Sequence, residues 1–139
     1  MKASLFYRIA AVLLVLFAVG HTLGFRKVDP HWGADAVAAA MQSVHFDVQG
    51  ASRSYWDFYV GFGLFVTVFL LFSVVLAWQL GGMSGDSLQR LSVIRWSFAL
   101  CFVGVTLLSL EYFFVVAIIF SAATTLCLIL GAWLGGRAS

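Results

Sequence analysis

The chain has 139 residues, of which 63% are hydrophobic and 10% are charged, and its formal net charge is +2. This small number of charged side chains cannot cover the surface of a soluble domain of this length. The composition therefore excludes an ordinary soluble protein. The net charge is too small and too dispersed for a nucleic-acid-binding protein, and we expect no nucleic-acid partner.

Four apolar segments approach or reach the length of a membrane span. A transmembrane helix needs about 20 predominantly apolar residues, and residues 58–80 and 112–134 each run for 23 residues without a charge. The other two segments have slightly polar ends, marked by His21 and Arg95. We therefore predict an all-α integral membrane protein, a single four-helix transmembrane bundle. Its expected spans are about 5–25, 56–80, 88–110 and 112–135 of the domain 1–139.

The outer loop, residues 26–55, is the only long connection. Asp29 and Pro30 form a typical helix start, with Asp as the cap and Pro at the first helical position. The run from Ala34 to Phe46 predicts a short amphipathic helix on the membrane surface, ended by Gly50. Its apolar face consists of Val37, Met41 and Val44.

The remaining connections are short. Residues 81–89 form a glycine-rich loop in which Asp86 or Ser87 can cap the third helix. Spans three and four have almost no linker, so the chain must reverse near Glu111 and Tyr112, the alternative being one continuous helix. No internal repeat is evident, which argues against an inverted-repeat transporter.

Small residues recur at helical spacing in the last two spans, which indicates close helix packing. We expect two seams that face each other or the bundle centre. They are Ser97, Cys101, Gly104, Leu108 and Glu111 in the third span, and Ala117, Ser121, Thr124, Leu128 and Gly131 in the fourth. Cys101 and Cys127 lie at different depths, so we expect packing residues rather than a disulfide.

The distribution of lysine and arginine indicates an orientation. Lys2, Arg8, Arg90, Arg95 and Arg137 lie on one side, against Arg26, Lys27 and Arg53 in the first loop. This bias of five to three favours cytoplasmic termini, in a bacterium an inner-membrane protein with the first loop outside.

Ionisable residues converge on one membrane rim in this topology. His21 ends span one, Asp57 begins span two and Glu111 closes span three, with His45 and Asp47 above them. Ionisable groups near hydrocarbon are costly and usually face the bundle interior with a partner. The sequence therefore predicts a polar rim on the outer side of the bundle.

Each rim residue also has a structural interpretation. His21 lies in a GxxxG stretch and its ring can simply bond a neighbouring carbonyl, while Glu111 can be solvated by interfacial water. Asp57 follows Ser54 by three residues, the spacing of a capping box. Arg53 can form an ion pair with Asp47 or Asp57 that pins the loop.

The rim residues lack the local spacing of known metal motifs such as HExxH or Glu-x-x-His. No pair of histidines stands at opposed mid-membrane positions, as a haem would require. We therefore expect no metal and no other cofactor.

The second span carries an aromatic stripe at helical spacing. Its members are Phe58, Phe62, Phe65, Phe69 and Phe72. Such a stripe is either a lipid-facing or packing ridge, or the wall of an apolar slot beneath the polar rim. Pockets for small ligands usually combine an apolar wall with a few convergent polar groups.

The stretches GHTLGF at 20–25, HFDVQG at 45–50 and SYWDFYVGFG at 54–63 resemble an uncharacterised family of small bacterial four-span membrane proteins. The resemblance covers nearly the whole chain and implies fold and localisation, but no activity. A weaker likeness, in layout alone, is to EXPERA-domain proteins such as sterol isomerases. That analogy would make Glu111 or Asp57 a proton donor or acceptor, with His21 as its partner.

The function we predict is binding of a hydrophobic small molecule or lipid in an outer-leaflet pocket with a polar rim. One alternative is a non-catalytic accessory subunit, and another is an intramembrane acid–base enzyme using Glu111, Asp57 and His21. Expected partners are membrane lipids, a hydrophobic ligand, and further copies or a larger membrane complex. The candidate ligand-binding residues are His21, His45, Asp47, Arg53, Trp56, Asp57, Phe58, Phe62, Phe65 and Glu111.

Overall fold

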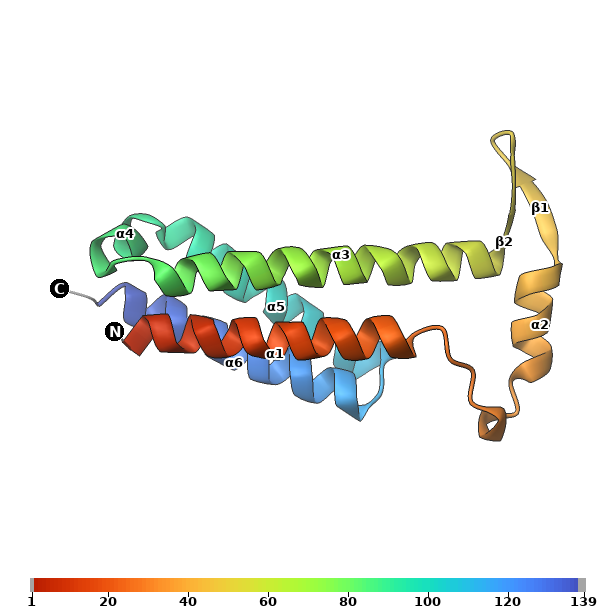
Figure 1. Cartoon of the computed structure of the whole chain (residues 1–139), viewed down its shortest axis with the longest axis horizontal. Coiled ribbons are helices and arrows are strands. Elements are labelled where there is room, and N and C mark those ends of the chain that lie inside the picture. Colours follow the sequence, from red (N-terminus) through yellow and green to blue (C-terminus); the bar gives the residue numbers. More distant parts are fainter. Residues whose placement is uncertain (1, 138–139) are drawn as a thin grey trace. The chain divides into compact units, whose positions relative to one another are not determined.

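The computed structural model describes residues 2–137, which fall into two compact units. Unit 1 comprises the described residues up to Phe17 together with those from Leu70 onward, and unit 2 comprises Ala18–Phe69. Two long helices, α1 (Lys2–Gly24) and α3 (Tyr55–Gly82), pass from one unit into the other (Figure 1).

Four helices within the described residues are long and apolar enough to cross a membrane. They are α1, α3, α5 (Ser92–Tyr112) and α6 (Val115–Gly135). The predicted all-α, four-helix membrane bundle is therefore confirmed. At 28 residues, α3 is the longest of these helices.

Helices α5 and α6 form a hairpin in unit 1. The reversal is confirmed near Glu111: α5 ends at Tyr112, Phe113 is extended and α6 begins at Val115. The continuous-helix alternative is thus wrong. Across the hairpin, the hydroxyls of Thr106 and Thr125 lie 2.9 Å apart, and Thr125 donates to the carbonyl of Phe102 at 2.8 Å.

The packing seam was predicted correctly for α6 but not for α5. All five small or apolar seam residues of α6 are buried. In α5, Ser97, Cys101, Leu108 and Glu111 are exposed and Gly104 is only half-buried. The buried residues of α5 are instead Arg95, Phe98, Ala99, Phe102 and Ser109. The buried face of α5 thus carries large side chains and that of α6 mostly small ones, a combination that close packing favours.

The core of unit 1 also includes the first part of α1 and the second part of α3. Its fully buried side chains include Tyr7, Leu14, Leu80, Phe102 and Leu128. The hydroxyl of Ser4 donates to the carbonyl of Gly81, which ties the start of α1 to the end of α3.

A short helix, α4 (Gly85–Arg90), separates α3 from α5. Its N-cap is Ser84, whose side chain accepts from the backbone N–H of Ser87. The N-cap of the third span, α5, is Leu91, so the expected cap of that span at Asp86 or Ser87 is wrong. The third span consequently begins at Ser92, after a non-helical Leu91, and not near residue 88.

Unit 2 contains the outer loop. Asp29 caps a single 3-10 turn, η1 (Pro30–Trp32), as the Asp-Pro pair predicts. Helix α2 (Asp35–Ser43) follows, and it is shorter than expected. Strands β1 (His45–Val48) and β2 (Ala51–Ser54) then form an antiparallel hairpin.

The hairpin corrects the expectation that the helix runs to Phe46 and ends at Gly50. The β-branched and aromatic residues Val44, Phe46 and Val48 favour an extended chain. Gln49 and Gly50 have positive φ angles of 50° and 84°, which are the angles of a two-residue hairpin turn.

Candidate ligand-binding site

The β-hairpin positions Arg53 at the start of α3. Phe46 and Arg53 are directly opposed in the strand register, so their side chains leave the same face of the hairpin. The ring of Phe46 stacks on that of Phe58, with 6.2 Å between centroids and 10° between planes. This contact turns the Arg53 face of the hairpin toward the first turn of α3.

A capping box fixes the same turn from the other side. Asp57 Oδ2 accepts from the backbone N–H of Ser54 at 2.8 Å and from its hydroxyl at 3.1 Å. The Ser54 hydroxyl in turn accepts from the backbone N–H of Asp57 at 3.2 Å. The reciprocal bonds satisfy donors that a helix start leaves without intrahelical partners. The capping interpretation of Asp57 therefore describes its observed contacts.

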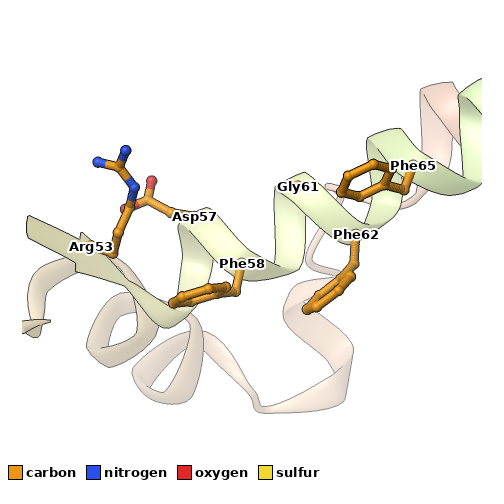
Figure 2. Close-up of a pocket in the computed structure, with 6 residues that line it drawn as sticks. All are labelled: Arg53, Asp57, Phe58, Gly61, Phe62 and Phe65. Atoms are coloured by element: carbon orange, nitrogen blue, oxygen red, sulfur yellow. The ribbon is translucent and has the colours of Figure 1, made fainter. Parts of the chain in front are cut away.

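A shallow pocket of about 260 Å³ lies along the first turns of α3. Figure 2 shows Arg53 and Asp57 beside each other at one end, with phenyl rings following along the helix. Phe62 and Phe65 are 66% and 73% exposed, so this wall faces outward from unit 2. The residues that line this α3 pocket are Arg53, Asp57, Phe58, Gly61, Phe62 and Phe65.

His21 contacts a different face of α3. Its Nε2 donates to the carbonyl of Gly63 at 2.9 Å, and its ring stacks on Phe25 with centroids 5.0 Å apart. The hydroxyl of Tyr59 donates to the carbonyl of Phe25. These contacts match the structural interpretation of His21, in which the ring bonds a neighbouring carbonyl.

Two threonines extend the same contact. The hydroxyls of Thr22 and Thr67 lie 3.0 Å apart, and each also donates to a carbonyl of its own helix. Gly63 provides the close approach, because a Cβ there would lie 2.2 Å from the Phe25 ring. Gly20 and Gly24, the expected GxxxG contact, have open space around them instead.

The other candidate residues do not line the α3 pocket. His45 and Asp47 leave the opposite face of the hairpin from Arg53, because they alternate with Phe46 along β1. His45 Nδ1 donates to the carbonyl of Ser43 at 3.1 Å, and the ring of Trp56 packs on Tyr59. Glu111 belongs to unit 1, where it is exposed at the end of α5.

Arg53 and Asp57 give the pocket its polar end. Their opposite charges interact, and one Arg53 nitrogen, Nη1, donates to the carbonyl of Ser52 at 2.8 Å. Within residues 2–137, no three histidine, cysteine or acidic side chains are arranged to hold a metal ion. The arrangement offers apolar contact along α3 and charged hydrogen-bonding groups at one end.

Gly61 lines the pocket but was not a candidate from the sequence. It lies on α3 between Phe58 and Phe62, and a Cβ placed there meets nothing within 4 Å. The GFG tripeptide 61–63 therefore combines two glycines with different roles. Gly61 leaves space in the pocket, and Gly63 admits the Phe25 ring.

No family model, no curated protein and no solved structure matches this chain.

Proposed function

We propose that this membrane protein binds a hydrophobic small molecule or lipid in the α3 pocket, with the apolar chain along Phe58, Phe62 and Phe65. Arg53 holds the polar end of the ligand. The observation that carries the proposal is the continuity of the charged pair with an outward-facing apolar groove in one pocket. Ligand sites commonly have this composition of apolar walls and few polar groups.

The size of the pocket limits the occupant. Its volume of about 260 Å³ is close to the lower end for small-molecule sites. The wall from Phe58 to Phe65 extends over about 10 Å, at 1.5 Å per residue. A single acyl or prenyl chain, or a small ring system, fits this space better than a bulky cofactor.

The contacts of Asp57 favour binding over acid–base catalysis. Its Oδ2 atom already accepts two hydrogen bonds from Ser54 in the helix cap. Arg53, by contrast, is exposed and cannot lose its charge at physiological pH. We therefore assign recognition of the polar group to Arg53 and orientation of the helix start to Asp57.

Filling the pocket tests the proposal. In Gly61→Leu the new side chain enters the open space between the phenyl rings, and it replaces a poor helix former with a good one. We expect the variant to fold and to lose at least 80% of the co-purifying ligand, a factor of about five that corresponds to roughly 1 kcal/mol. The measurement is native mass spectrometry of gently extracted protein, with lipidomics of the bound fraction.

The matched control is Gly20→Leu, because Gly20 also has open space around it and lies on α1 of the same unit. It should retain ligand at the level of the unaltered protein. Equal ligand content in Gly61→Leu and the unaltered protein would overturn the proposal. So would stoichiometric partner chains without any bound small molecule, a result that supports the accessory-subunit function.

We also propose that both termini are cytoplasmic and that the membrane is a bacterial inner membrane, which the bias of positive residues supports. With Cys101 and Cys127 replaced by alanine, Ser43→Cys in α2 should react with a membrane-impermeant maleimide in intact cells. Ser87→Cys in α4 should react only after lysis. The reverse labelling pattern would show the opposite orientation.

A further inference from the structure

An arginine is buried within unit 1. Arg95, the fourth residue of α5, is only 2% exposed. Its Nη1 donates to the carbonyl of Ala132 near the end of α6, where a cation also complements the helix dipole. Its Nε has no hydrogen-bond partner among the described residues. An unpaired donor of a buried cation is costly, because the group has lost its water.

A second orphaned polar group belongs to the same site. Tyr7 of α1 is 0% exposed, and its hydroxyl has no partner within residues 2–137. Tyr7 and Arg95 approach the same face of α6, because Gly131 and Gly135 are about one turn apart. Two glycines of α6 make room for the pair, since a Cβ at Gly131 would lie 3.0 Å from the Tyr7 ring and one at Gly135 2.7 Å from Arg95 Nη1.

No buried counter-charge for Arg95 is present among the described residues of unit 1. Its range of the sequence contains two acidic residues, Asp86 and Glu111, and both side chains are exposed. Glu111 also lies 16 residues further along α5, about 24 Å at the rise of an α-helix. A buried cation without a counter-charge normally destabilises a protein. Arg95 and Tyr7 therefore form a site that would be stabilised by an anion.

The location of the pair limits the source of that anion. Arg95 lies in the first turn of α5, Gly135 ends α6 and Tyr7 lies in the second turn of α1, so the pair is near one end of the spanning helices. That is the depth of the lipid headgroups, not of the bilayer centre.

Two more arginines surround this end of unit 1. Arg8 stacks on Trp78 at 3.6 Å and Arg137 on Trp133 at 3.8 Å, measured from the guanidinium carbon to the ring centroid. Stacking on an indole holds a guanidinium in place and leaves its N–H edge available for phosphate. Basic residues at this depth attract anionic lipids.

We propose that Arg95 and Tyr7 form a binding site for a phosphate group, supplied in the membrane by an anionic phospholipid headgroup. Oxygens of the phosphate accept from Arg95 Nε and from the Tyr7 hydroxyl, which satisfies both orphaned donors. Arg8 and Arg137 bind the outer part of the headgroup. This site is independent of the α3 pocket, which belongs to unit 2.

Thermal unfolding in an uncharged detergent tests the site. Added phosphatidylglycerol should raise the unfolding midpoint of delipidated protein by about 5 °C. Diacylglycerol, which lacks the phosphate, should not. Tyr7→Phe, which removes a single hydroxyl, and Arg95→Gln should each lose most of this shift. Arg26→Gln, which removes a charge from unit 2, should keep it.

Inorganic phosphate distinguishes the two sources of the group. A shift with phosphatidylglycerol alone identifies a lipid headgroup, whereas an equal shift with inorganic phosphate identifies a free anion in the same site. An equal shift with diacylglycerol would overturn the proposal. Tyr7→Phe that retains the full phosphatidylglycerol shift would do the same, even if Arg95→Gln fails to fold.

Discussion

Gly63→Ala is expected to destabilise unit 2 by about 1 kcal/mol, although alanine is the better helix former. Overpacking a close contact typically costs 1–3 kcal/mol, and roughly 1 kcal/mol is regained from helix propensity. The new Cβ would lie 2.2 Å from Cε2 of Phe25. That ring cannot move freely, because it stacks on His21 and its backbone carbonyl accepts from Tyr59.

The control for Gly63→Ala lies two residues away. Gly61→Ala places its Cβ in open space, so it should stabilise α3 by a few tenths to about 1 kcal/mol. Both variants can be compared by unfolding in increasing mole fractions of a denaturing detergent. Opposite signs at the two glycines are the expected result. Equal stabilisation would mean that Phe25 does not pack against Gly63 in solution.

The bundle was predictable because its signals are long and local. Each span is a run of apolar residues that no short-range alternative interrupts, and the length of a bilayer crossing is fixed. The capping box was predictable for a similar reason, since Ser54 and Asp57 are three residues apart and both bonding partners lie in that window. Features whose interacting residues lie within a few helical turns can be predicted without knowledge of the tertiary structure.

Features that depend on contacts between segments were missed. In the hairpin turn Gln49 has a positive φ, and this conformation is uncommon for glutamine, so the residue type does not predict the turn. The small residues of α5 predict the wrong buried face for that helix. In the structure, Phe98 and Phe102 supply the bulk that the small residues of α6 lack.

Most of the α3 pocket could be inferred from the phenylalanine spacing, because residues 58, 62 and 65 share a helical face. The phosphate site was not inferred. Its signal was an arginine inside an otherwise apolar span, but Arg95 was interpreted as a polar helix end. Its burial depends on the close approach to Gly135, which is 40 residues away in the sequence.

The second large effect is expected at Phe102, which is fully buried in α5 and packs edge-on against Phe98 with centroids 5.5 Å apart. In a membrane the transfer term largely disappears, because lipid is as apolar as the protein interior. The cavity term remains. At about 24 cal/mol per Å³, a cavity of roughly 100 Å³ costs about 2.4 kcal/mol. Phe102→Ala should therefore destabilise unit 1 by about 2 kcal/mol in the same unfolding assay.

Leu100→Ala on the same helix is the control that separates the contribution of packing from that of hydrophobicity. Leu100 is 65% exposed, so its side chain contacts lipid before and after unfolding, and the variant should change the unfolding free energy by less than about 0.5 kcal/mol. The backbone carbonyl of Phe102 still accepts from Thr106 and Thr125 in Phe102→Ala, so the hairpin hydrogen bonds are retained in the comparison. Equal losses at the two positions would mean that α5 does not bury its phenylalanine face against α6. The large-against-small packing that sets the α5–α6 hairpin would then be wrong.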